Sequence, residues 1–415
     1  MISKLVHVIA AAAFAACAGA THAADTVKLA FFGGLSGPQG HVGEEQLKAF
    51  KAAADMLNAR GGLANGKKVE IVAFDNKNTP QETLVLLKQA IDQDIRYGMA
   101  TVSSVAHAVN DALTKHNERN PDRIMLFLDY NALDPALTED KCSFWHFRFE
   151  SHASMQANAM TDYMAKQKSI RKVYLFNQDY AYGQAVAKVS RQMLTAKRPD
   201  VEIVGDELVP LSKVKDFAPY VAKIRASGAD AVFTGNWGND LSLLVKASAE
   251  AGLKADYYTL LGKLPGTWTT VGSVGADRIK TVDAWHINAA DATWEKALVE
   301  SRKKYDASSN MDYLTAYRTV EMLAAAIAKA GSDDPLKVAY ALEGAHFAGP
   351  TGDSWIRAED HQIIAPMYVL SLAKQGQPGV RHDTDGTGYG WKTEAVMAAK
   401  DNVPEMKCKM ERPAR

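Results

Sequence analysis

Side chains able to act as nucleophiles, bases or metal ligands are present in this chain, but their spacing matches no catalytic motif. Ser36, in Gly34-Leu35-Ser36-Gly37, is not in a nucleophile elbow, because a glycine follows the serine directly. The glycines at 386, 388 and 390 are not a dinucleotide fingerprint, since no strand precedes them and no helix follows. The sequence has no phosphate loop, and its 11 histidines are scattered. We therefore expect a protein that is not an enzyme and that uses no cofactor.

One segment partly matches a calcium-binding loop. Asp383, Asp385 and Glu394 stand at the first, third and twelfth places of that motif, but Thr387 replaces the expected Asp or Asn. The preceding Gln377-Pro378-Gly379 cannot end an entering helix. We expect a glycine-rich turn here and no metal ligands, with calcium binding as the alternative.

Two serines stand where a strand-like stretch gives way to a helix. Ser103 and Ser104 open a helix that we expect to run to about Lys115. Free backbone N–H groups and hydroxyls at a helix start form a ready site for an anion, such as a ligand carboxylate. The alternative is that these serines only cap the helix.

Aromatic residues lie at the ends of predicted elements rather than inside apolar periods. Tyr130, Tyr182, Trp237 and Tyr313 have this placement, and Asn131 follows the first of them. Several aromatic side chains on loops of different segments can build an apolar pocket of ligand size.

These positions belong to a pattern of alternating strands and helices. The predicted strands are residues 27–32, 69–74, 123–128, 172–176, 202–207 and 231–234. The predicted helices are residues 44–59, 80–93, 155–167, 183–196, 217–227 and 241–251. Repeated βα units imply parallel sheets, whose ligands lie at the carboxyl ends of the strands. A length of 415 residues exceeds what one core usually serves, so two lobes are expected.

The first residues have the features of a secretion signal. Lys4 precedes an apolar stretch over 5–16, and small residues over 21–24 form a cleavage site, so residues 1–23 are a predicted signal peptide. Lipid attachment at Cys17 is the alternative. We expect a periplasmic protein in which Cys142 and Cys408 form a disulfide, or else remain unrelated thiols. The net charge of zero gives no electrostatic reason to expect nucleic acid or an anionic membrane as a partner.

The sequence resembles the leucine/isoleucine/valine-binding protein family of ABC transporters, from about Val27 to Leu372. The motifs that carry the resemblance are spread along the chain in the family's order. They are FFGGLSGP (31–38) with Gly43-Glu44, LNARGGLANGKKVEI (57–71), DPALT (134–138), WHFR (145–148), DYAYG (179–183), KDF (215–217), GADAVFTGNWGND (228–240) and DYLTAY (312–317).

The resemblance implies an α/β fold of two Rossmann-like lobes with parallel sheets, joined by a three-strand hinge. Lobe 1 would comprise residues 24–150 plus 286–360, and lobe 2 residues 151–285 plus 361–374. Residues 375–415 are expected to form an irregular tail. By matching the family's motifs, Ser103 and Ser104 would bind a ligand carboxylate. Asn131, Leu133, Tyr182, Trp237 and Tyr313 would complete the pocket.

The chain departs from the family at one position that matters for the ligand. Amino-acid binders hold the ligand ammonium with an acidic residue after the strand near 257–260, where this chain reads Leu261-Gly262-Lys263-Leu264. A buried ammonium without a carboxylate partner is strongly disfavoured. We therefore doubt an α-amino acid ligand unless Asp240 or Glu150 supplies the charge, and an aromatic acid, another anion or a neutral polar molecule fits better. Lys263 would contact that ligand or, alternatively, be a solvated loop residue.

The resemblance implies that the chain is the monomeric solute-binding component of an ABC importer. Its partners would be a small ligand, enclosed by hinge closure, and the permease subunits in the inner membrane. The alternative is an extracytoplasmic sensor that passes ligand binding to a receptor or regulator.

Overall fold

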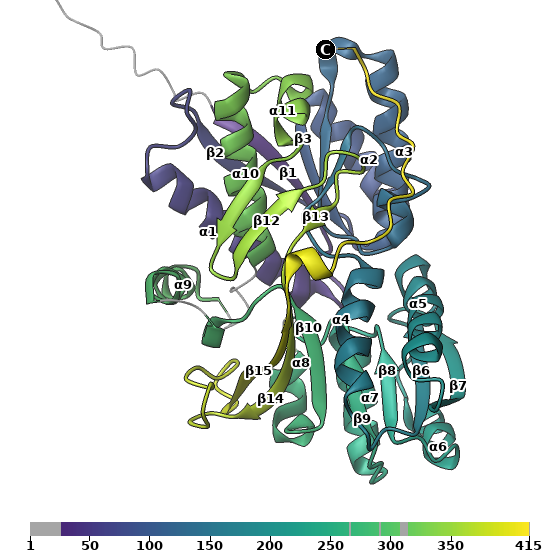
Figure 1. The fold of residues 1–415 in the computed structure, drawn as a ribbon. Helices are drawn as coiled ribbons and strands as arrows, with labels where there is room; N and C mark the ends of the chain where they lie inside the picture. The colour runs from purple at the N-terminus through teal and green to yellow at the C-terminus, as the bar shows by residue number, and fades with distance from the viewer. Residues whose placement is uncertain (1–25, 265–266, 290–291, 308–313, 415) are drawn as a thin grey trace, which may run out of the picture.

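Alternating strands and helices build two α/β lobes, one above the other, in the computed structural model (Figure 1). The structure describes residues 26–264, 267–289, 292–307 and 314–414. The predicted signal peptide over 1–23, Cys17 and Tyr313 lie outside these residues. Among the residues in these ranges, no helix is both long and apolar enough to span a bilayer.

Lobe 1 is built on a parallel five-stranded sheet in the order β2-β1-β3-β4-β5. Its strands are β1 (Thr26–Gly33), β2 (Lys68–Asp75), β3 (Tyr97–Thr101), β4 (Leu126–Asn131) and β5 (His146–Arg148). Its helices are α1 (Gly40–Ala59), α2 (Pro80–Asp92), α3 (Ser103–Arg119), α10 (Leu314–Ala330) and α11 (Pro335–Leu342). Leu29 and Phe31 pack with α1 and α10, while Ala30 and Phe32 pack with α2 and α3. Because both faces are covered, β1 is a continuous apolar run.

Lobe 2 contains a seven-stranded sheet in the order β15-β14-β10-β9-β8-β6-β7. Its strands are β6 (Lys172–Gln178), β7 (Glu202–Val209), β8 (Ala231–Thr234), β9 (Asp256–Thr259), β10 (Ile279–Asp283), β14 (Met367–Lys374) and β15 (Tyr389–Met397). Its helices are α4 (Ala153–Ala165), α5 (Ala181–Lys197), α6 (Ala218–Ala226), α7 (Gly238–Glu250) and α8 (Thr267–Val271). The strands from β6 to β10 are parallel, whereas β14 and β15 are added antiparallel.

Smaller elements complete lobe 1 and the connections. Strands β11 (His346–Gly349), β12 (Gly352–Ile356) and β13 (Ile363–Ile364) form an antiparallel sheet. Helix α9 (Ala292–Tyr305) buries Leu298 in the lobe-1 core. The short 3₁₀ helices are η1 (Pro121–Arg123), η2 (Pro135–Thr138), η3 (Gly272–Gly275), η4 (Ile287–Ala289) and η6 (Ala399–Asp401).

The chain passes between the lobes near two of the expected positions and slightly after the third. The first two passages follow β5 and β10. The third was expected near 360, but β13 pairs with β12, and a bridge joins Gln362 to Arg148. These pairings hold the chain in lobe 1 through Ile364, so the passage lies at 365–366, just before β14.

The C-terminal segment is more ordered than the expected irregular tail over 375–415. That expectation is wrong for Tyr389–Met397, which pairs along β14 as β15 and buries Trp391 against Trp268. The chain then returns to lobe 1 past η6 and runs beside it to the C-terminus (Figure 1). A disulfide joins Cys142 to Cys408, with Cα atoms 5.7 Å apart. Arg357 also donates to the Pro404 carbonyl at 2.7 Å. The tail is therefore a fourth connection between the lobes.

The alternative of a calcium loop at 383–394 finds little support in this geometry. Glu394 lies on β15, where it accepts hydrogen bonds from Ser371 (2.6 Å) and Lys392 (3.1 Å). Asp383 accepts from the Gly388 N–H at 2.9 Å within a turn. No group of three or more His, Cys, Asp or Glu side chains in the described ranges is arranged to hold a metal ion.

We predict that removing the disulfide lowers stability through the unfolded chain. The bridge closes a loop across 266 residues of sequence, so its loss increases the entropy of the unfolded state. The variant Cys142→Ser/Cys408→Ser should lose about 2–4 kcal/mol of unfolding free energy. Thermal denaturation with and without reductant measures this. The wild type should lose the same stability on reduction and the variant none, and an unchanged wild-type melting temperature would contradict the prediction.

Candidate functional site

A pocket lies between the two lobes, where the carboxyl ends of their strands meet. It contains about 430 Å³ of space free of protein atoms, part of which is open to solvent. Its walls come from the segments that follow β1 to β4 in lobe 1 and β6, β8 and β9 in lobe 2. The lining residues are Gly34, Gln39, Val42, Gly43, Gln46, Asn78, Thr101, Val102, Ser103, Asn131, Leu133, Tyr180, Tyr182, Trp237, Leu261 and Leu264. This is where ligands of parallel α/β sheets bind.

Ser103 lines this pocket at the start of α3, and Ser104 does not. The side chains of these serines do not cap the helix, because the N-cap residue is Val102 and no side-chain capping bond forms. The Ser103 hydroxyl oxygen instead accepts from the backbone N–H groups of Leu133 (3.1 Å) and Asp134 (3.0 Å). The first N–H groups of α3 have no acceptor inside the helix and are available to an anion in the pocket.

Three aromatic side chains form the lobe-2 wall. The Trp237 indole N–H donates to the Tyr180 hydroxyl at 2.9 Å, and the rings of Tyr180 and Tyr182 lie 5.9 Å apart. Tyr182 is buried, and its hydroxyl has no hydrogen-bond partner. Burial raises the pKa of both tyrosines, so both hydroxyls keep their protons at neutral pH. Sequence reasoning found Tyr182 and Trp237 but missed Tyr180, although it also stands directly before a helix.

Two other predicted contact residues lie outside this pocket. Tyr130 belongs to the core of lobe 1, where its ring packs on Phe31 and Phe50 at 5.4 and 5.0 Å. Strand β4 extends to Asn131 instead of ending at 128, so Tyr130 is inside the strand rather than on a loop. Lys263 is buried and pairs with Asp283, with Nζ and Oδ2 3.5 Å apart. It lines a smaller neighbouring cavity and is not a solvated loop lysine.

The lining of the pocket contains no charged side chain among the described residues. Asp240 is fully buried behind it, where it accepts hydrogen bonds from Gln178 (2.8 Å) and the Ser212 N–H (2.9 Å). Burial raises the pKa of Asp240. Glu150 lines only the neighbouring cavity. Neither acid lines the pocket, although the Oδ1 atom of Asp240 has no hydrogen-bond partner.

Gln39 closes the gap between the lobes. Its side-chain amide donates to the Ser212 hydroxyl at 3.1 Å, and its oxygen accepts from the Asn239 N–H at 3.3 Å. Gly238 lies against this contact with φ of +55°, and a Cβ atom there would be 2.1 Å from the Gln39 oxygen. The lobes are thus closed on each other. Sequence reasoning missed Gln39, Gln46, Asn78 and Thr101, since single polar residues in loops carry no pattern.

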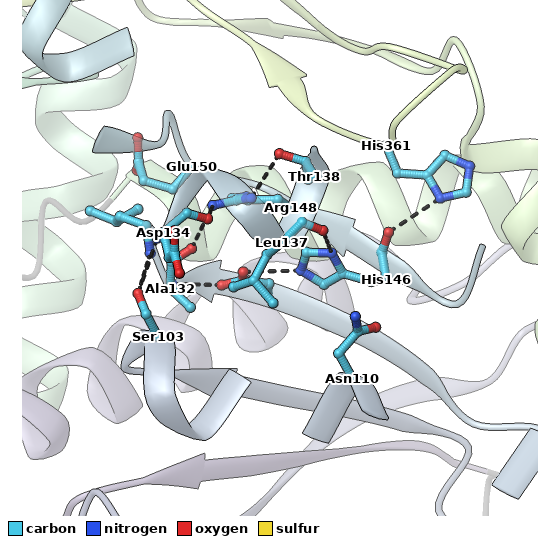
Figure 2. Close-up of polar contacts among 12 residues, drawn as sticks. Ser103, Asn110, Ala132, Asp134, Leu137, Thr138, His146, Arg148, Glu150 and His361 are labelled. Atoms are coloured by element: carbon cyan, nitrogen blue, oxygen red, sulfur yellow. Dashed lines mark hydrogen bonds and ion pairs between the residues drawn. The ribbon is translucent and has the colours of Figure 1, made fainter. Parts of the chain in front are cut away.

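A buried polar network holds the loop of Asn131 and Leu133 in place (Figure 2). The Arg148 guanidinium donates to the carbonyls of Ala132 (2.9 Å) and Asp134 (2.7 Å) and to the Thr138 hydroxyl (2.7 Å). The Arg148 backbone N–H donates to the His361 carbonyl at 3.0 Å. One side chain in β5 therefore joins the ligand loop to two of the passages between the lobes.

His146 supports the same loop from the other side (Figure 2). Its ring nitrogens contact the Leu137 carbonyl at 3.1 Å and an Asp129 carboxylate oxygen at 3.0 Å. The other Asp129 oxygen accepts from the N–H groups of Asn131 (3.1 Å) and Ala132 (2.7 Å). Burial lowers the pKa of His146, although the Asp129 carboxylate beside it favours the protonated ring.

The comparisons with known proteins agree on one family. The profile of the periplasmic binding protein family matches residues 26–377. Leu/Ile/Val-binding protein homolog 4 of Brucella abortus (strain 2308) is 32% identical over 416 residues, which cover 98% of this chain and 97% of the relative.

Solved structures share the fold. The leucine-, isoleucine-, valine-, threonine-, and alanine-binding protein of Brucella ovis, in a closed conformation, has a TM-score of 0.82 at 29% identity, covering 94% of this chain and 100% of that chain. An ABC-transporter solute-binding protein of Rhodopseudomonas palustris BisB5, in complex with 3,4-dihydroxybenzoic acid, has a TM-score of 0.78 at 20% identity, covering 90% and 98%.

We predict that acid destabilises the protein through its buried histidines. His152 caps α4 by accepting from the Ser154 N–H at 3.2 Å. Burial, with Arg148 and Arg357 nearby, holds its pKa well below the usual value. Since the unfolded chain takes up the proton first, stability should fall as the pH drops below about 6.5.

The variant His152→Asn keeps the cap but cannot titrate. Its melting temperature should fall less than that of the wild type between pH 7.5 and pH 5, as followed by circular dichroism. An equal fall in both proteins would contradict this assignment.

Proposed function

Because the chain belongs to the periplasmic binding protein family, we propose that it delivers a small carboxylate that lacks an ammonium group to an ABC importer of the branched-chain amino acid type. The observation that carries this proposal is the uncharged lining of the pocket between the closed lobes. The family binds substrates and does not convert them, which agrees with a chain in which no catalytic motif was found.

An amino acid ligand is disfavoured by the cost of burying its ammonium group. Removing that group from water costs several kcal/mol unless a carboxylate and further acceptors replace the lost hydration. Asp240 lies behind the pocket wall with its hydrogen bonds turned to Gln178 and Ser212. Within the described ranges, the lining offers hydroxyl and amide groups but no counter-charge.

A carboxylate needs no cationic side chain in this pocket. The N-terminus of α3 presents backbone N–H groups, and the partial positive charge of a helix end stabilises an anion. The Ser103 hydroxyl lies at the same point. The apolar body of the ligand would contact Tyr180, Tyr182 and Trp237, which favour a flat or branched group.

The relatives support two different ligands. The Rhodopseudomonas palustris protein of the same fold binds 3,4-dihydroxybenzoic acid, an aromatic carboxylate without an ammonium group. The Brucella relatives carry names that refer to leucine, isoleucine and valine. The absence of an acid from the pocket lining favours the first ligand class.

Uptake would begin with closure of the lobes on the ligand. The ligand would contact lobe 1 through α3 and lobe 2 through the aromatic wall, so it would bind the closed form better and shift the population toward it. The Gln39 contacts with Ser212 and Asn239 join the two lobes and would add to the stability of the closed form. The permease would then recognise the closed lobes.

We predict that the ammonium group of an amino acid is sufficient to weaken its binding to the pocket. 3-Phenylpropanoate should bind at least ten times more tightly than phenylalanine, and 4-methylpentanoate more tightly than leucine, because each pair differs only in that group. Isothermal titration calorimetry gives each Kd, and tenfold corresponds to about 1.4 kcal/mol. Preferential binding of phenylalanine or leucine would refute the proposed ligand class.

We also predict that Gly238→Ala prevents full closure. The new Cβ would meet the Gln39 oxygen, so the closed form should be disfavoured and the Kd raised at least tenfold. Gly228→Ala is the matched control, since Gly228 has a similar φ of +68° but open space around its Cβ position. It should lower the melting temperature with little effect on Kd. Small-angle scattering should show ligand-dependent compaction in the control but not in Gly238→Ala. An unchanged Kd in Gly238→Ala would show that the contact does not limit closure.

A further inference from the structure

A second cavity opens beside the ligand pocket at the hinge. It contains about 310 Å³ of space free of protein atoms, part of which is open to solvent, and it shares Asn131, Leu261 and Leu264 with the pocket. We call it the hinge chamber. Its remaining lining residues are Glu150, Gln156, Leu260, Lys263, Val282, Asp283 and Ala284. The two spaces therefore adjoin, but charged side chains line the chamber, whereas the described residues that line the pocket are uncharged.

The charged groups of the hinge chamber already have partners of opposite charge. Lys263 pairs with Asp283 at 3.5 Å, and Glu150 lies 3.6 Å from Arg318. Glu150 also accepts from the Ser151 N–H at 2.8 Å. Because these charges are compensated inside the protein, the chamber has no electrostatic need for an ionised ligand group.

Gln156 is the residue of the chamber with unused hydrogen-bonding capacity. Its side chain is 3% exposed, and its amide oxygen has no hydrogen-bond partner. A buried acceptor without a donor is unfavourable, so a ligand group that donates to this oxygen is stabilised there. A ligand hydroxyl group can pair with either polar atom of a side-chain amide, since it can donate to the oxygen and accept from the nitrogen.

The chamber adjoins the part of the pocket near Ser103, where the ligand carboxylate would bind, as well as the part near the aromatic wall. The Ala153 N–H at the start of α4 donates to the Leu133 carbonyl at 2.9 Å. The Leu133 N–H in turn donates to the Ser103 hydroxyl at 3.1 Å. Gln156 is in the first turn of that same helix α4. A substituent that reaches Gln156 from a carboxylate at Ser103 would be attached close to that carboxylate.

From this arrangement we propose that the hinge chamber binds a hydroxyl group on the carbon next to the ligand carboxylate, with Gln156 as its partner. The ligand class is then a 2-hydroxy acid with an aromatic or branched apolar body. This inference rests on the proposed function, because it takes a carboxylate at the start of α3 as given.

The test compares ligands that differ only at that carbon. The probes are 3-phenylpropanoate, the two enantiomers of 3-phenyllactate, and phenylalanine, titrated calorimetrically into the full-length mature protein. One enantiomer of 3-phenyllactate should bind about tenfold more tightly than 3-phenylpropanoate. In Gln156→Leu this advantage should disappear, while the Kd for 3-phenylpropanoate should stay within about twofold. Gln192→Leu on the exposed face of α5 is the matched control and should behave as the wild type.

The possible outcomes test the hydroxyl subsite and the proposed function separately. If 3-phenylpropanoate binds but neither enantiomer binds more tightly, the hydroxyl subsite is refuted and the proposed function stands. The subsite is also refuted if the advantage persists in Gln156→Leu. If neither 3-phenylpropanoate nor 3-phenyllactate binds while phenylalanine does, the proposed function fails and the subsite fails with it. Gln156→Glu is a second variant in case Gln156→Leu does not fold, and it should bind 3-phenylpropanoate more weakly because it adds a negative charge.

Discussion

The arrangement of this protein depends on one buried guanidinium. Arg148 ends β5, where the chain first leaves lobe 1, and it is fully buried. It donates to two carbonyls of the ligand loop, while its own backbone is bridged to the third passage between the lobes. Its two Nη atoms make these bonds and the bond to Thr138, whereas its Nε has no hydrogen-bond partner. Moving the carbonyls of the loop would leave more of this buried charge without partners, which favours one conformation of the pocket wall.

Much of the fold could be predicted from the sequence because its cause is local. Alternating apolar strands and amphipathic helices require parallel sheets covered on both faces, and such sheets place their ligand loops at one edge. Ser103, Asn131, Tyr182 and Trp237 were predicted in this way from the ends of elements, whereas Leu133 and Leu261 came from the family resemblance. All six line the pocket. Tyr130 was misplaced because β4 continues three residues beyond its apolar run. The end of a strand depends on its neighbour in the sheet, which no local pattern records.

Other features depend on contacts between distant segments and were out of reach. Gln39 matters because Ser212 and Asn239 lie against it, some 170 and 200 residues away. Strand β15 forms because β14 would otherwise have a long unpaired edge, although its own segment is rich in glycine and charge. The expected irregular tail followed from that composition. Pairing across the sheet was the stronger effect, and the disulfide then holds the chain that follows β15 on lobe 1.

An uncharged pocket has a consequence for selectivity. A transport protein in the periplasm meets amino acids together with acids that lack the ammonium group. A pocket with a carboxylate would accept the first and repel the second, whereas a pocket without one excludes amino acids by desolvation alone. The charges near this site are held apart from it, with Lys263 paired to Asp283 and Asp240 turned to Gln178 and Ser212. Internal pairing thus leaves hydrogen bonding and apolar contact to decide which ligand would bind between the lobes.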